Sequence, residues 1–165
     1  MARTPPCGWP YSTSPEIKDR RSYRFLPLNL ILLIDDDATS NYVNQRLLKN
    51  SDAARHVDIA LNGQEALDYL ANRNASAGQL TPEAIFLDVQ MPVMDGFGFL
   101  ECYSHLPSEQ RAQVLFILNS AASSFDRERL KSFPAVIEQL DAPLSPEYLQ
   151  EMLRRHFADR FTPEG

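Results

Sequence analysis

From residue 28 onward, short apolar segments alternate with segments of helical periodicity, and this alternation limits the fold more than any other feature of the chain. Apolar or β-branched runs occur at residues 30–34, 84–87, 114–118 and 136–140, with a weaker one at 56–60. Runs that are apolar throughout are typical of strands covered on both faces, as in parallel sheets. The predicted fold class is therefore α/β, with a five-stranded parallel sheet in a doubly wound (βα)5 arrangement.

The segments between these runs each have one apolar face at a spacing of three or four residues, which is typical of amphipathic helices. The last helix has clear boundary signals, because Ser145 is a favourable N-cap and Pro146 suits the first helical position. The apolar positions of the five predicted helices are Val43, Leu47 and Leu48; Ala66, Leu67 and Leu70; Phe97, Leu100 and Tyr103; Leu130 and Phe133; and Leu149, Met152, Leu153 and Phe157.

The composition excludes several classes of protein. With 165 residues, 44% of them hydrophobic and 23% charged, the chain can bury a core of its own. No apolar run reaches the roughly 20 residues that a membrane-spanning helix needs. Cys7 and Cys102 fit no metal or redox spacing, which favours the cytoplasm, and His56, His105 and His156 are predicted at the surface without a metal. A net charge of -6 argues against binding to nucleic acid or acidic membranes.

The first 27 residues differ from the rest of the chain. They contain five of the 12 prolines and five basic against two acidic side chains, and no period of a helix or strand. Such a segment has too little apolar surface to offset the entropy of ordering it. We expect residues 1–27 to form a flexible Pro-rich arm, residues 28–158 to form the folded domain, and residues 159–165 to form a C-terminal tail.

Aspartates follow two of the predicted strands. Asp35, Asp36 and Asp37 come directly after the first strand, and Asp88 ends the third. In a sheet of flavodoxin-like order 2-1-3-4-5 these two strands are neighbours, so Asp35, Asp36 and Asp88 would converge at the carboxyl edge, where ligands bind. Carboxylates so close repel one another and need a cation. Hard oxygen ligands favour Mg²⁺, or Mn²⁺, over zinc.

Three motifs resemble the receiver domain of two-component response regulators. They are LIDDD at 33–37, NGQEAL at 62–67 and LDVQMPVMDG at 87–96, and the likeness extends over about residues 29–158. The third motif is highly specific, because an aspartate that ends an apolar strand is followed at fixed offsets by Met-Pro and Asp-Gly.

The resemblance implies a function for each matching position. Asp88 would accept a phosphoryl group from a histidine kinase or phosphotransfer protein, and Asp35 and Asp36 would hold Mg²⁺ or Mn²⁺ together with Asp88 and the main-chain carbonyl of Gln90. A carboxylate is a competent nucleophile, and a metal ion neutralises charge on the phosphoryl oxygens. The protein would then signal through contacts with other proteins and would not itself be an enzyme.

Three positions depart from the family pattern. Asn119 stands where similar receivers have threonine or serine, and Ala142 stands where they have a lysine before a proline. Gln139 occupies the position of an aromatic residue that responds to phosphorylation. An asparagine can still donate a hydrogen bond, whereas alanine offers the phosphoryl group neither charge nor donor.

Two hypotheses therefore stay open. The first is a single-domain response regulator that is phosphorylated on Asp88, with a homodimer possible through the face formed by the fourth helix and the fourth and fifth strands. The second is a degenerate pseudo-receiver, an interaction module that works without phosphorylation. A hydrolase of the haloacid dehalogenase kind is disfavoured because Gln90 stands where it needs a second aspartate. A flavin phosphate would be repelled by the three aspartates after the first strand.

Overall fold

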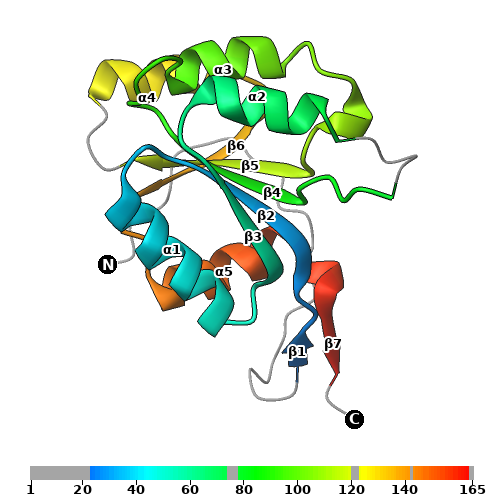
Figure 1. Ribbon diagram of the computed structural model, residues 1–165. Coiled ribbons are helices and arrows are strands. Elements are labelled where there is room, and N and C mark those ends of the chain that lie inside the picture. The colour runs from blue at the N-terminus through cyan, green and yellow to red at the C-terminus, as the bar shows by residue number, and fades with distance from the viewer. Residues whose placement is uncertain (1–22, 74–77, 120–122, 142, 164–165) are drawn as a thin grey trace, which may run out of the picture.

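The computed structural model describes residues 23–73, 78–119, 123–141 and 143–163, and its centre is a five-stranded parallel sheet of order β3-β2-β4-β5-β6. In chain order of the sheet strands this is 2-1-3-4-5, so the predicted flavodoxin-like fold is confirmed. Helices α1 and α5 cover one face, and α2, α3 and α4 cover the other (Figure 1). The elements are β2 (Leu28–Ile34), α1 (Ala38–Asn50), β3 (Ala54–Ala60), α2 (Gly63–Ala71), β4 (Ala84–Asp88), α3 (Gly96–Tyr103), β5 (Val114–Asn119), α4 (Ser124–Leu130), β6 (Val136–Asp141) and α5 (Pro146–His156).

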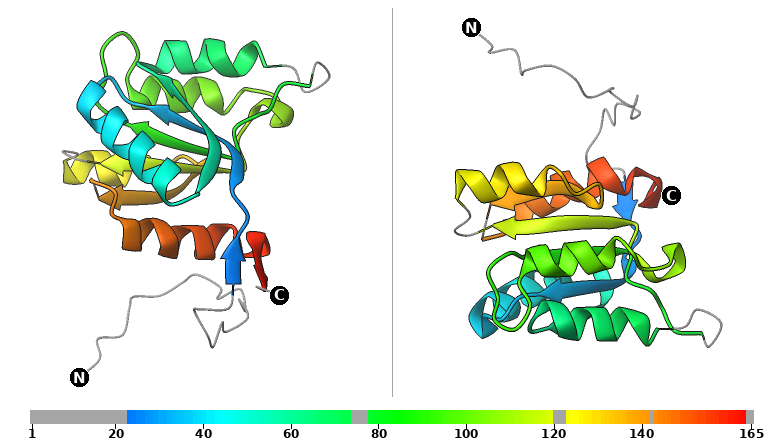
Figure 2. Two further views of the ribbon diagram at one scale, coloured as in Figure 1. Left: turned by 60° about the horizontal axis from the view of Figure 1, so that its bottom comes forward. Right: turned by 90° about the horizontal axis from the view of Figure 1, so that it is seen from above.

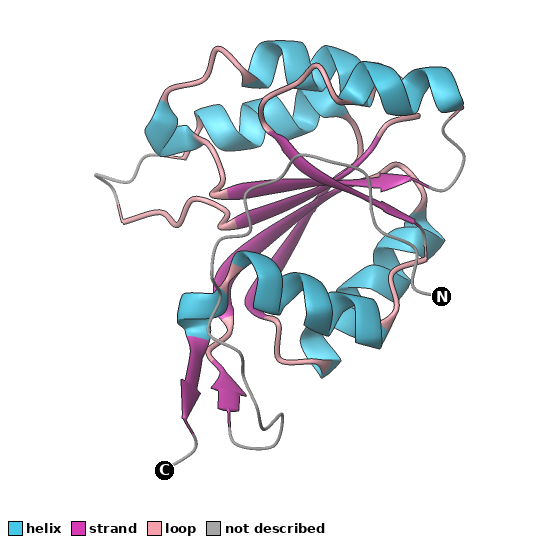
Figure 3. Ribbon diagram, turned by 180° about the vertical axis from the view of Figure 1, so that it is seen from behind, coloured by secondary structure: helices cyan, strands magenta, loops and turns pink. Residues whose placement is uncertain are grey.

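The core consists of two clusters, one on each face of the sheet. Along β2, Ile31 and Leu33 pack on the α1 and α5 side, whereas Leu32 and Ile34 pack on the α2 and α3 side. Successive residues of a strand point to opposite faces, and helices cover both faces here, so all four side chains are buried. The three-layer arrangement of helices, sheet and helices is visible from behind in Figure 3. Because helices cover both faces of the sheet, β2 is apolar along almost its whole length.

Side-chain caps fix where the helices begin. Asp37 accepts a hydrogen bond from the Ser40 N–H at 2.6 Å at the start of α1, and these contacts lower the pKa of Asp37. Asp95 caps α3 in the same way, and Ser145 caps α5 with Pro146 at its first position, as predicted. The third aspartate of the Asp35–Asp37 triplet therefore has a structural role.

One predicted surface position is wrong. His156 at the end of α5 is only 16% exposed, and its Nε2 lies 2.7 Å from Glu138 on β6. Arg155 and the Tyr148 hydroxyl contact the same carboxylate, and these contacts lower the pKa of Glu138 to about 2. The sequence shows only the apolar face of this helix, so it does not reveal that His156 is bound to the sheet.

A second, two-stranded sheet joins the two ends of the described chain. Strand β1 (Tyr23–Phe25) pairs antiparallel with β7 (Phe161–Pro163), and the Phe25 and Phe161 rings lie 5.0 Å apart. This ribbon, which we call the terminal clasp, projects from the domain beside the start of β2 (Figure 2). No regular structure was expected in the predicted arm or tail, whereas Tyr23–Phe25 of the arm pairs with Phe161–Pro163 of the tail. Strands of three residues are too short to produce a detectable period.

Candidate functional site

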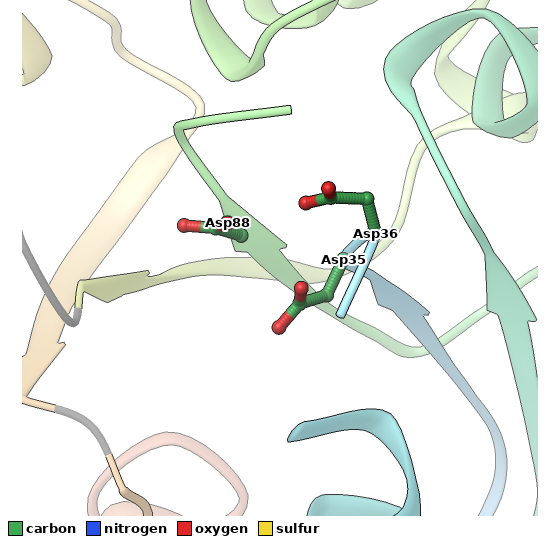
Figure 4. Close-up of side chains that lie close together, drawn as sticks. All are labelled: Asp35, Asp36 and Asp88. Atoms are coloured by element: carbon green, nitrogen blue, oxygen red, sulfur yellow. The ribbon is translucent and has the colours of Figure 1, made fainter. Parts of the chain in front are cut away.

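Three carboxylates meet at the carboxyl edge of the sheet. Asp35 and Asp36 follow β2, and Asp88 ends β4, which is hydrogen-bonded directly to β2 with Ile34 opposite Leu87. One carboxylate oxygen from each residue lies within 4.8 Å of the other two (Figure 4). Sheet order and register therefore bring together the three aspartates that the sequence singled out.

Asp35 is fixed from several directions. Its backbone N–H donates to the Ala60 carbonyl at 3.1 Å, and its own carbonyl accepts from the side-chain amide of Asn41 at 2.7 Å. Its Oδ1 accepts the Asp37 N–H at 2.8 Å. The side chain is only 8% exposed, and burial together with the charges of Asp36 and Asp37 raises its pKa.

Asp88 is held by the loop that follows it. Its Oδ1 accepts the Val89 N–H at 2.8 Å, and the Gln90 N–H also donates to the carboxylate. Burial and, second, the charge of Asp35 raise the pKa of Asp88 to about 6. Because desolvation and like charge both disfavour ionised carboxylates, this group of side chains favours a bound cation.

Gly96 allows the next helix to approach the acidic site. A Cβ atom there would lie 2.8 Å from the Asp88 carbonyl oxygen and 2.8 Å from the Val89 Cα, closer than such atoms pack. The Gly96 N–H donates to the Val89 carbonyl at 2.8 Å. Helix α3 begins at this glycine, with Asp95 as its N-cap. This glycine is needed for close packing, whereas the unusual backbone conformation of the loop occurs at Val93, with φ of 67°.

A cavity of about 250 Å³ opens beside the carboxylates, between α1 and the ends of β4 and β5. The residues that line it are Asp35, Thr39, Ser40, Val43, Asn44, Asp88, Leu118 and Pro143.

Two asparagines of α1 lie on its buried face, which the apolar pattern of the sequence did not reveal. Asn41 and Asn44 are 4% and 8% exposed, whereas Val43, which the sequence assigned to the buried face, is 46% exposed. Asn41, Asn44 and Leu48 form one buried face at helical spacing. Polar residues in register with a core leucine were the available signal that this face borders a polar site.

The positions that depart from the family pattern are only partly described. Gln139 on β6 is partly buried, and its side-chain amide donates to the Arg127 carbonyl of α4 at 3.0 Å. Asn119 ends β5 opposite Asp141, but its side chain lies outside the described part of the chain. Ala142 also lies outside the described residues.

Comparison with known proteins identifies the family. The model of the response regulator receiver domain matches residues 31–154. This chain belongs to the response regulator receiver family. Receiver domains are signalling modules of two-component systems and interact with histidine kinases or phosphotransfer proteins. The terminal clasp lies outside the matched residues on both sides.

Curated proteins similar to this receiver domain include response regulators and histidine kinases. Response regulator Rre1 of Synechocystis is 29% identical over 133 residues, which cover 80% of this chain and 52% of that protein. Sensor histidine kinase CheAY of Helicobacter pylori is 30% identical over 127 residues, which cover 76% of this chain and 15% of that protein. The chain spans 7%, 54% and 52% of the lengths of three curated relatives.

Solved structures of receivers have the same fold. The response regulator receiver protein of Dyadobacter fermentans is 31% identical, with a TM-score of 0.67, covering 78% of this chain and 97% of that one. The receiver domain of sensor histidine kinase PA1611 of Pseudomonas aeruginosa, described with magnesium coordinated in its active site cleft, is 22% identical, with a TM-score of 0.65, covering 79% and 98%. In the described part of this receiver domain, no helix is long and apolar enough to cross a membrane.

Proposed function

We propose that this receiver domain accepts a phosphoryl group on Asp88 with the help of Mg²⁺ or Mn²⁺ and signals through contacts with other proteins. The observation that carries the proposal is the convergence of Asp35, Asp36 and Asp88, with one oxygen of each within 4.8 Å of the other two. Membership of the family supports a role in two-component signalling, and the three carboxylates support metal binding and phosphoryl transfer.

The donor atoms fit a hard divalent cation. Asp35, Asp36 and Asp88 offer only carboxylate oxygens, which suit Mg²⁺ and Mn²⁺ better than softer metals. They would hold the ion together with the main-chain carbonyl of Gln90. When bound, the metal neutralises charge on the transferring phosphoryl oxygens.

The Asp88 carboxylate is oriented for nucleophilic attack. The N–H groups of Val89 and Gln90 hold it at the end of β4, and the ionised form provides the attacking oxygen. This oxygen forms a bond to phosphorus while the N–P bond of a phosphohistidine breaks, and the bonding electron pair leaves with the imidazole. The product is an acyl phosphate on Asp88.

The donor would be a histidine kinase or phosphotransfer protein, as suits the family. The pseudo-receiver stays a second candidate, because Gln139 ties β6 to α4 by a hydrogen bond that does not involve the acidic site. Homodimer formation through α4, β5 and β6 also stays a prediction.

Incubation with Mg²⁺ and acetyl phosphate, followed by intact mass measurement, tests the proposal. We expect the gain of one phosphoryl group, dependent on Mg²⁺ and absent from Asp88→Asn. The matched control is Asp159→Asn, since Asp159 is an exposed aspartate in a short 3-10 helix after α5. A mass gain that persists in Asp88→Asn, or no gain by a protein that binds Mg²⁺, would contradict it.

Backbone NMR spectra before and after phosphorylation separate the two candidates. A response regulator should show changes that reach α4 and β6, because a signal must alter a surface that partners contact. Changes restricted to the acidic site would favour the pseudo-receiver.

A further inference from the structure

The cavity beside the acidic site combines two kinds of surface. Asp35 and Asp88 provide carboxylates, and Val43, Leu118 and Pro143 provide apolar side chains. The volume of about 250 Å³ exceeds the roughly 30 Å³ share of one water molecule several times over. A ligand that fits both surfaces has a positively charged end and a short aliphatic part.

Asn44 is the second observation that points to a ligand. Only 8% of this residue is exposed, and it lines the cavity. Its side chain makes no hydrogen bond to another described residue. Its amide is not sealed into the core, in contrast with the Oδ1 atom of Asn41. Buried amides normally have partners, so this one is available to a polar group that enters the cavity.

The charge of the site requires more positive charge than one divalent metal supplies. Asp35, Asp36 and a phosphorylated Asp88 would together carry about four negative charges, of which one Mg²⁺ neutralises two. The described lining contains no lysine, arginine or histidine. An excess of about two negative charges would therefore remain beside the cavity.

We propose that this cavity binds a primary ammonium group on a short aliphatic stem, supplied by a small amine or by a lysine side chain of a docking protein. The ammonium donates to Asp35, Asp88 and the Asn44 Oδ1, and the stem packs on Val43, Leu118 and Pro143. A compact ammonium suits this arrangement better than a planar guanidinium, which forms a wide bidentate fork. The role in charge balance rests on the proposed function, but the binding itself does not.

Titration of the full chain with methyl-, ethyl-, propyl- and butylammonium chloride at pH 7.5, with and without Mg²⁺, tests the proposal by backbone NMR. At constant ionic strength, we expect saturable shifts around the cavity and an affinity that rises about two- to four-fold with each methylene, as burial of apolar surface requires. Tetramethylammonium, which has no N–H donor, should bind at least about five-fold more weakly than butylammonium. Equal affinity across the series, or no saturable binding, would overturn the proposal.

Asn44→Leu removes the amide while keeping the shape of the side chain, and it should weaken butylammonium binding about five-fold. Asn50→Leu is the matched control, since Asn50 is exposed at the end of the same helix, and it should bind as the wild type does. Circular dichroism establishes that both variants are folded. Unchanged binding by a folded Asn44→Leu protein would overturn the proposal, and Asn44→Gln, which restores an amide, provides a second test.

Nα-acetyl-lysine methylamide distinguishes the two sources of the ammonium group. Binding as tight as that of butylammonium supports a lysine side chain of a partner, and binding by butylammonium alone supports a free amine. Amine binding by a protein that acetyl phosphate does not phosphorylate would leave this proposal standing and contradict the proposed function. Phosphorylation without amine binding would do the reverse.

Discussion

The environment of Asp88 makes its charge depend on pH near neutrality. Burial and the nearby Asp35 charge raise its pKa to about 6, so the folded protein binds a proton more readily there than the unfolded chain does. Ionisation of Asp88 therefore costs folding stability as the pH rises from about 4 through 6. A metal that binds the ionised form reverses this cost.

Mg²⁺ affinity should consequently fall as the pH drops below about 6. Protons and the metal compete for Asp88, so we expect up to about a ten-fold loss of affinity per pH unit below that value. Calorimetric titration between pH 5 and 8 measures it. An affinity that is constant over this range would show that Asp88 is not a ligand.

Gly96→Ala should disturb the acidic site through the backbone. The new methyl group would meet the Asp88 carbonyl and the Val89 Cα at 2.8 Å, neither of which is the flexible end of a side chain. The strain of this overpacking is typically about 1–3 kcal/mol. Because the strain falls on the backbone of Asp88 and Val89, we expect at least about a ten-fold loss of Mg²⁺ affinity and slower phosphorylation. Gly98→Ala is the matched control, because its nearest neighbour is the flexible Met94 side chain at 3.2 Å. Equal behaviour of the two variants would refute this role of Gly96.

The sequence predicted the convergence of the three aspartates but did not reveal the two buried asparagines of α1. Asp35, Asp36 and Asp88 end apolar strands, and the edge of a parallel sheet brings such residues together whatever the details of packing. The approach of Asn41 and Asn44 depends on how α1 is rotated about its axis. The assignment of the exposed Val43 to the buried face had set that rotation incorrectly.

Among the five α-helices of the described chain, α4 has the fewest buried residues. Leu130 is its buried residue, and Phe125 is 75% exposed. The amide of Gln139 on β6 donates to the Arg127 carbonyl of this helix. A helix with one buried side chain depends strongly on such local contacts.

Gln139→Ala should loosen α4 without affecting the acidic site. We expect α4 amide hydrogens to exchange about five-fold faster, since one hydrogen bond contributes about 1 kcal/mol, while phosphorylation of Asp88 is unchanged. Hydrogen exchange with mass spectrometry measures the exchange of the α4 amides, and intact mass after treatment with acetyl phosphate and Mg²⁺ measures the phosphorylation. Gln113→Ala, at an exposed position before β5, is the control. Unchanged exchange in α4 would mean that this hydrogen bond does not hold the helix.

For the whole molecule, the terminal clasp joins parts of the chain that are far apart in sequence. Besides the ring contact of Phe25 with Phe161, the Leu26 N–H donates to the Arg160 carbonyl at 2.8 Å. Arg160 also pairs with Glu83, which precedes β4 and accepts a hydrogen bond from the Asn29 N–H. The clasp lies beside the start of β2, whereas the acidic site follows its end (Figure 1).

Phe161→Ala should therefore lower stability and leave the site intact. Loss of a partly buried ring costs about 1–3 kcal/mol, a few degrees in the midpoint of thermal unfolding, with unchanged Mg²⁺ affinity. Phe125→Ala, which removes a largely exposed ring, should change the midpoint little. Equal midpoints for the two variants would show that the clasp does not stabilise the domain.

Apolar periods in the sequence predicted the five sheet strands and the helices on both faces of the sheet. The strand order came from the likeness to flavodoxin-like sheets, because a local period does not determine which strands are neighbours. They failed for the clasp and for His156, which depend on single contacts between distant residues such as Phe25 with Phe161. Such contacts leave no local period in a sequence. The site was thus predictable where it follows from topology and unpredictable where it follows from packing.

The most direct test of the central claim is to locate the phosphoryl group. Protein treated with acetyl phosphate and Mg²⁺ is reduced with borohydride, which converts an acyl phosphate of aspartate to homoserine, and its peptides are then sequenced by mass spectrometry. We predict homoserine at position 88 and only when Mg²⁺ is present. Homoserine at Asp35 or Asp36, or at no position in a protein that binds Mg²⁺, would contradict the assignment of Asp88 as the phosphoacceptor.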